Sequence, residues 1–217
     1  MNAIEANNAL AKYSGKNNFH LTFDLKVKEG DFCLFVGSNG SGKTTLFDII
    51  IGYKKLNKGE LINNKQKEIA YCVQDFNGGL FPWFSVIENI LLPAKATNLF
   101  NNNLREEALY LLKLFKLDSR ADDYPYALSG GQKQIVNIIR TICTPCEIML
   151  FDEPFSALHS DSRTLAKRII QELSHKKTIL LISHSNEDID MNFNRFFVYQ
   201  NNQIQETDKD TIKTIIK

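Results

Sequence analysis

The chain has few cysteines, almost no net charge and no long apolar run. Its 217 residues contain 4 cysteines, which suggest no disulfide framework in a chain of this length. A formal net charge of +1 argues against a global basic surface for nucleic acid, so we expect no nucleic-acid partner. No apolar run approaches the ~20 residues that a membrane-spanning helix needs. These absences exclude several classes and leave an ordinary globular protein.

Two further absences concern location and metal chemistry. The first residues, Met1–Glu5, lack the pattern of a signal peptide, so we expect a cytoplasmic chain that reaches a membrane only through a partner. Cys143 and Cys146 have redox-motif spacing. They do not open a helix after a strand, however, and no second cysteine pair or histidine cluster accompanies them. We therefore expect neither a redox nor a zinc site there.

A glycine-rich loop between an apolar run and a helical pattern is the first positive signal. Phe32–Val36 reads as a strand buried on both faces, and Lys43–Ile51 reads as a helix. Glycines in the loop let backbone amides surround a triphosphate, and the helix N-terminus favours an anion. Lys43 is expected to reach the β- and γ-phosphates, and the Thr44 hydroxyl to bind Mg²⁺. The expected phosphate contacts are Gly37, Ser38, Asn39, Gly40, Ser41, Gly42, Lys43, Thr44 and Thr45.

A second apolar strand ends in two carboxylates. Ile148–Phe151 is followed directly by Asp152 and Glu153. Asp152 at the strand's tip is placed to hold Mg²⁺, and Glu153 is placed to polarise the water that attacks the γ-phosphate. Paired acids after a strand are often only a solvated loop, but the phosphate loop upstream favours catalysis.

Between these motifs, Leu128–Gln132 (Leu-Ser-Gly-Gly-Gln) resembles the signature sequence of the ATP-binding cassette (ABC) family. Ser129 is a good N-cap with Gln132 three residues later, as in a capping box. The resemblance covers nearly the whole chain and implies ATP and Mg²⁺ as ligands. It also implies that the signature helix contacts nucleotide bound to a second cassette. The expected contacts are Ser129, Gly130, Gly131 and Gln132.

Three more residues stand where the family places functional groups. Gln74, after the apolar strand Ile69–Val73, resembles the Q-loop glutamine that helps to place Mg²⁺ and the attacking water. His184, after Thr178–Ser183, resembles the switch histidine that contacts the γ-phosphate. Tyr13 resembles the aromatic residue that stacks on adenine, although aromatics in early strands are commonly core residues.

One residue departs from the family pattern. Where the family usually has aspartate after Phe155–Leu158, this chain has His159. A histidine titrates near neutral pH and can donate a hydrogen bond. Communication between two catalytic sites is altered, or a different cassette compensates, or the change is tolerated; the sequence leaves these three open.

The resemblance implies an α/β fold, with a P-loop NTPase core of ABC type, an N-terminal antiparallel β region and an inserted α-helical subdomain. We expect one nucleotide-binding domain over residues 1–217, with a core at 1–74 and 146–217 and a helical signature subdomain at 75–145. The alternating run Phe19–Val27 predicts a strand. Leu104–Leu117 predicts a helix, and the three asparagines before it, 101–103, predict a polar loop.

The aromatic segment Phe81–Phe84, followed by the helical pattern Val86–Ile90, is the best indication of a partner. It resembles the nitrate, sulfonate and taurine importer group. In transporter cassettes this region borders the groove for an integral membrane permease, and an aromatic plug inside the subdomain is the simpler alternative. We therefore expect an ATPase subunit that pairs with a second cassette, as a homodimer or heterodimer, at the inner face of the membrane, with an importer favoured. A soluble non-transport ABC ATPase, an exporter or lipid-trafficking subunit, and a cassette with little turnover are the alternatives.

Overall fold

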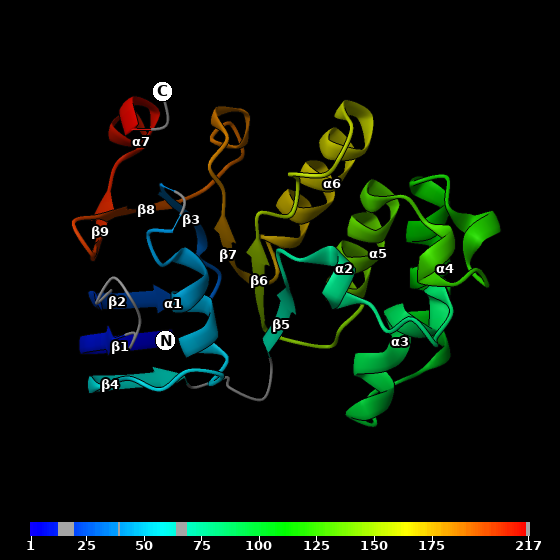
Figure 1. The fold of residues 1–217 in the computed structure, drawn as a ribbon, viewed down its shortest axis with the longest axis horizontal. Coiled ribbons are helices and arrows are strands. Elements are labelled where there is room, and N and C mark those ends of the chain that lie inside the picture. Colours follow the sequence, from blue (N-terminus) through cyan, green and yellow to red (C-terminus); the bar gives the residue numbers. More distant parts are fainter. Residues whose placement is uncertain (13–19, 39, 64–68, 216–217) are drawn as a thin grey trace.

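One mixed β-sheet organises the residues that the computed structural model describes, which are 1–12, 20–38, 40–63 and 69–215 (Figure 1). The strand order is β4-β1-β2-β9-β8-β3-β7-β6-β5. The strands are β1 Asn2–Lys12, β2 His20–Lys28, β3 Phe32–Gly37, β4 Lys58–Asn63, β5 Ile69–Cys72, β6 Ile148–Asp152, β7 Thr178–Ile182, β8 Arg195–Gln200 and β9 Gln203–Thr207. The helices are α1 Lys43–Ile50, α2 Phe76–Gly79, α3 Val86–Ala96, α4 Asn102–Leu114, α5 Gly130–Ile142, α6 Ser160–Leu173 and α7 Lys209–Ile215, with 3₁₀ turns η2 Asp118–Arg120, η3 Pro125–Ala127 and η4 Asn186–Asp188.

The centre of the sheet is parallel and buried on both faces. β3 pairs with β7, β7 with β6 and β6 with β5, all in parallel register. Side chains alternate between faces along a strand, so Leu34 and Val36 join one buried cluster while Cys33 and Phe35 join the other. One cluster includes helices α3–α6, and the other includes α1 and the antiparallel strands β1 and β2. This is why the sequence shows continuous apolar runs here rather than alternation.

The N-terminal antiparallel part stands at one end of the molecule, and β8 and β9 form a further antiparallel pair within the sheet. β1 pairs antiparallel with both β2 and β4, and Figure 1 shows these three strands beside α1 at the opposite side from α3 and α4. The predicted strand at Phe19–Val27 corresponds to β2. This arrangement confirms an N-terminal antiparallel β region.

Helices α2–α5 all fall between β5 and β6 in the chain, where a helical insertion was predicted. One local prediction there is wrong. Asn102 and Asn103 form the first turn of α4 instead of a loop, because Asn101 caps the helix by accepting a hydrogen bond from the Leu104 amide at 3.0 Å. The same helix ends at Leu114, earlier than predicted, and Lys116 takes a left-handed φ of 58°.

The topology collects the motifs at one edge. Gly37, Asp152 and Ile182 lie at the carboxyl ends of neighbouring parallel strands, and Phe35 and Asp152 both pair with Ile182. In open parallel sheets the carboxyl edge is where ligands bind. The strand order therefore brings three segments to the same edge of the sheet. They are the phosphate loop, the paired acids, and the segment with Ser183 and His184 that follows Ile182.

Candidate functional site

The glycine-rich loop follows β3 and leads directly into α1. Gly40 and Gly42 have φ values of 76° and 98°, a region that side-chain-bearing residues rarely adopt. A Cβ on Gly37 would lie 2.7 Å from the Tyr199 Cβ, so this position has no room for a side chain. The sequence thus needs glycine at these positions to bring the loop's backbone over the start of α1.

Lys43, the first residue of α1, is buried with its ammonium group turned back over the loop. Its Nζ donates to the carbonyl oxygens of Gly37 at 2.8 Å and of Ser38 at 2.9 Å. Burial lowers the pKa of Lys43, while the nearby charges of Glu153 and Asp152 act in the opposite direction. The Lys43 ammonium group therefore lies against the phosphate loop and close to Asp152 and Glu153, where it could contact a bound phosphate.

Asp152 ends β6 as a buried carboxylate with two hydroxyl donors. Its Oδ2 accepts from Thr44 Oγ1 at 2.7 Å and from Tyr71 Oη at 3.3 Å. Burial raises the pKa of Asp152, and the hydrogen bond from Thr44 partly offsets that rise. Thr44 and Asp152, which were each predicted as Mg²⁺ ligands, thus lie in direct hydrogen-bond contact.

Tyr71, in contrast, was missed, because it looks like an ordinary strand aromatic. Its one sequence signal is that it lies on β5, three residues before Gln74. Burial raises its pKa strongly, so the phenol is held as a neutral donor to the Asp152 carboxylate.

Glu153 is held between two other predicted residues. Gln74 Nε2 donates to Glu153 Oε2 at 3.1 Å, and His184 Nδ1 lies 3.1 Å from Glu153 Oε1. The glutamate is 9% exposed and has a left-handed φ of 49°, an uncommon conformation for a residue other than glycine. Its amide donates to the Ile182 carbonyl at 3.0 Å. The backbone at the end of β7 thus fixes the direction in which the Glu153 side chain points.

His184 and the phosphate loop face a common space. Gly37, Ser38 and His184 line one cavity of about 360 Å³, together with Tyr199 of β8. Ser183 is anchored below it, because its amide donates to the Phe35 carbonyl at 3.1 Å. The structure therefore brings the phosphate loop, the acids, Gln74 and His184 into one cluster.

The signature residues form a second group, at the start of α5. Ser129 and Gln132 make the predicted capping box: the Ser129 amide donates to Gln132 Oε1 at 2.9 Å, and the Gln132 amide donates to Ser129 Oγ at 3.3 Å. A Cβ on Gly131 would lie 2.9 Å from the Ala157 carbonyl oxygen, so glycine lets the segment after Glu153 approach α5. Tyr13 and Asn39 lie outside the described residues.

The family model described as ABC transporter matches residues 21–156, which is more than half of the chain. This chain belongs to the ABC transporter family. The chain is therefore an ATP-binding, ATP-hydrolysing transporter subunit, as the sequence predicted.

Relatives of this ABC protein include several import subunits. It is 35% identical over 188 residues to a probable ABC transporter ATP-binding protein of Campylobacter jejuni, covering 80% of this chain and 77% of the relative. It is 34% identical to the taurine import ATP-binding protein of Rhizobium johnstonii, covering 77% of this chain and 66% of that one. An aliphatic sulfonates import ATP-binding protein of Pseudomonas fluorescens is 33% identical, with 81% and 65% covered. The predicted likeness to the sulfonate and taurine group is thereby confirmed.

Solved structures confirm the predicted fold class. A dimeric ATP-binding cassette in a post-hydrolysis state, bound to ADP and Pi, superposes with a TM-score of 0.84 at 27% identity, covering 95% of this chain and 98% of that one. In the part of this ABC chain that the structure describes, no helix is both long and apolar enough to cross a membrane.

Proposed function

We propose that the cluster at the carboxyl edge of the sheet binds ATP with Mg²⁺ and hydrolyses it to drive transport through a separate permease. The observation that carries this proposal is the buried Glu153 carboxylate, held between Gln74 and His184 and close to Lys43. A carboxylate fixed beside a phosphate loop is placed to accept a proton from an attacking water. Gln74 and His184 would keep Glu153 oriented and complete the γ-phosphate contacts.

The donor set around Asp152 fits Mg²⁺. Thr44 supplies a hydroxyl oxygen and Asp152 a carboxylate oxygen, 2.7 Å apart. Gln74, which contacts the neighbouring Glu153, carries an amide oxygen that we assign to the same ion. Oxygen ligands are those that Mg²⁺ prefers. Burial disfavours the Asp152 charge, which a cation at this position would offset. Bound there, Mg²⁺ would neutralise phosphate charge, while Lys43 and the loop amides hold the phosphates.

A second cassette would complete the site. The chain has one phosphate loop and one signature, so two ATP sites require two cassettes facing each other. The capped start of α5 presents backbone amides and a helix N-terminus, which favour an anion. The dimeric cassette among the structural relatives supports this arrangement. We assign Ser129, Gly130, Gly131 and Gln132 to nucleotide bound by the partner cassette, and residues 75–145 to a helical subdomain that moves relative to the core.

The permease would dock beside α2 and α3. A groove of about 410 Å³ lies there. Its lining includes Tyr71 of β5 and Val73 just after it, together with Phe81 before α3 and Arg140 of α5. Phe81 and Trp83 are 41% and 66% exposed, and their ring centroids lie 5.5 Å apart. Exposed aromatics rimming a groove are common anchors for a protein partner. The import relatives favour an importer, with this subunit at the inner face of the membrane.

Replacing the proposed base tests the function. We expect Glu153→Gln to lower the rate of ATP hydrolysis by about 100-fold or more, with ATP affinity unchanged, because the amide cannot take up the water's proton. Phosphate release and binding of a fluorescent ATP analogue measure the two quantities. Glu147→Gln is the matched control, since Glu147 precedes the same strand at its other end. Equal hydrolysis by the parent and Glu153→Gln would refute the catalytic assignment.

A further inference from the structure

A buried carboxylate outside the catalytic cluster gathers two cations from α6. Asp188, in the 3₁₀ turn η4, is 2% exposed. Its Oδ1 accepts from Arg163 Nη2 at 2.9 Å and lies 2.7 Å from Lys167 Nζ, while its Oδ2 accepts from Ser183 Oγ at 2.5 Å. A charge this buried is retained only with such partners. The cluster therefore ties the start of α6 to the segment after β7.

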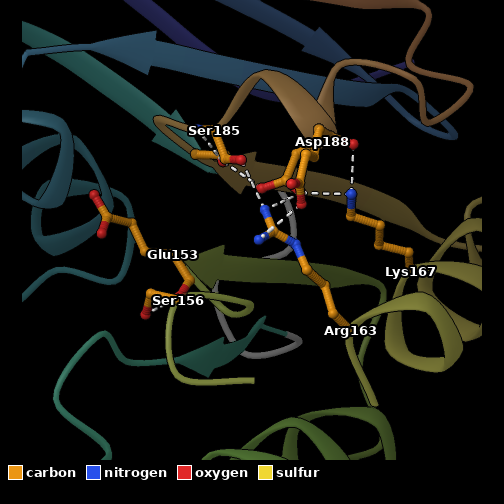
Figure 2. Close-up of polar contacts among 8 residues, drawn as sticks. Glu153, Ser156, Arg163, Lys167, Ser185 and Asp188 are labelled. Carbon is orange, nitrogen blue, oxygen red and sulfur yellow. Dashed lines mark hydrogen bonds and ion pairs between the residues drawn. The ribbon is translucent and has the colours of Figure 1, made fainter. Parts of the chain in front are cut away.

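Arg163 holds that segment at three residues, because besides Asp188 it contacts Ser185 and also Glu187, whose Oε2 lies 3.0 Å from Arg163 Nη1. Arg163 Nη2 also donates to Ser185 Oγ at 2.8 Å, and the Ser185 amide donates to Ser183 Oγ at 3.0 Å. Figure 2 shows Arg163 reaching from α6 to both Ser185 and Asp188, with Lys167 contacting the Asp188 side. Since Ser183 and Ser185 flank His184, these contacts bracket the histidine that meets Glu153.

Arg163 itself lies at the start of α6, just after the segment that contacts the signature helix. The Arg163 amide donates to the His159 carbonyl at 2.8 Å, so Arg163 belongs to the first turn after His159. Just upstream, the Ala157 carbonyl lies against Gly131 of the signature helix. One side chain thus joins the segment that contacts α5 to the segment that carries His184.

We propose that Arg163, through Ser185 and Asp188, is a positioning residue that sets the His184–Glu153 contact and couples it to the segment 155–159. Lys167 is the informative contrast, because it binds the same carboxylate and the Glu187 carbonyl. Lys167 also lies over the Phe155 ring, 5.8 Å from its centroid, so it too touches the segment 155–159. Arg163 differs from it in donating to Ser185, next to His184. Loss of Arg163 therefore removes the side-chain contact beside His184. Loss of Lys167 also removes a cation from Asp188, but it leaves the hydrogen bonds of Arg163 to Ser185 and Asp188 in place. The catalytic part of this inference rests on the proposed ATPase mechanism.

The test uses the ring resonances of the chain's 4 histidines, recorded by NMR on the full chain, with His184→Ala assigning the His184 signal. We expect Arg163→Gln to move the His184 resonance toward its position in Glu153→Gln, and Lys167→Gln to leave it in place. Arg168→Gln is a second control, since Arg168 is an exposed arginine on the same helix. Ser185→Ala removes one side-chain bond to Arg163 and should move the resonance in the same direction, which keeps the test decisive if Arg163→Gln folds poorly.

Hydrolysis supplies the second readout. We expect kcat of Arg163→Gln to fall by about 10- to 100-fold with KM unchanged, and the loss to disappear in a His184→Ala background, because residues acting through one another are not additive. An unmoved His184 resonance in both Arg163→Gln and Ser185→Ala, or a full additional loss on top of His184→Ala, overturns the positioning role while leaving the ATPase standing. If the parent and Glu153→Gln hydrolyse ATP equally, the proposed function fails, and the NMR result alone then decides whether Arg163 positions His184.

Discussion

At the residue scale, the site combines three unfavourable choices that a purely structural core would avoid. Glu153 has a left-handed backbone, Lys43 is a buried cation, and Asp152 is a buried carboxylate. Strained or desolvated groups of this kind cluster at functional sites, where a ligand compensates them. The sequence pattern predicted which residues these are. Their strain and burial follow only from the backbone that the sheet edge imposes.

Asp152 gives a prediction in which stability and function change in opposite directions. Burial raises its folded-state pKa above the ordinary 3.8. The folded chain therefore binds protons more readily than the unfolded chain, and the charged carboxylate costs stability at pH above the folded pKa. We expect Asp152→Asn to raise the free energy of unfolding at pH 7.5 by about 1 kcal/mol, while Mg²⁺-dependent hydrolysis is lost.

Urea unfolding of the ligand-free chain at several pH values checks this. The advantage of Asp152→Asn over the parent should shrink as pH falls through the folded pKa toward 3.8, because the parent carboxyl then becomes neutral as well. Asp190→Asn, at an exposed position, is the control for removing one acid. A variant less stable than its parent at pH 7.5 would contradict the prediction.

At the scale of the element, the helices near the site differ in how their N-termini are capped. α3 and α5 both open with complete capping boxes, at Ser85 with Glu88 and at Ser129 with Gln132. α6 differs, because its N-cap is His159, whose side chain makes no capping bond. The family's usual aspartate would accept a hydrogen bond from a free backbone amide in the first turn of α6. Having His159 in its place therefore removes a stabilising cap from this helix.

We expect His159→Asp to stabilise the chain by about 1 kcal/mol, since aspartate accepts from the free amides of the first turn and its charge suits the helix N-terminus. Thermal or urea unfolding measures the change. His159→Asn supplies the cap without the charge and should recover most of the gain. If neither variant is more stable than the parent, the helix start does not govern this position.

At the scale of the whole molecule, the carboxyl edge of the sheet and the helical region α2–α5 are neighbours because β5 is the last strand of the sheet. Gln74 lies shortly after β5, which ends at Cys72, and contacts Glu153, while Phe81 lines the groove a few residues later. Figure 1 shows this helical region extending away from the antiparallel strands. A partner in the groove would therefore lie a few residues along the chain from Gln74, which contacts Glu153.

We expect Trp83→Ala to reduce the amount of chain that sediments with membranes containing its permease by about 10-fold, with ATP hydrolysis by the free chain unchanged. The reason is that Trp83 is the most exposed aromatic beside the groove, at 66%. Trp83 adjoins the groove through its ring contact with Phe81. Tyr53→Ala is the matched control, because Tyr53 is a 78% exposed aromatic in the segment between α1 and β4. Equal sedimentation of Trp83→Ala and the parent would exclude this surface as the docking site.

The sequence by itself determined the family, the fold class and the residues of the cluster, because each motif is a local pattern: an apolar strand followed by glycines, acids, glutamine or histidine. It predicted α4 less well, since a cap such as Asn101 acts through one hydrogen bond that composition does not show. Tyr71 and the contacts of Arg163 were beyond it altogether. Tyr71 and Asp152 are 81 positions apart, and Arg163 and Asp188 are 25 positions apart. Only the parallel order of β3, β7, β6 and β5 brings such distant side chains within hydrogen-bond reach.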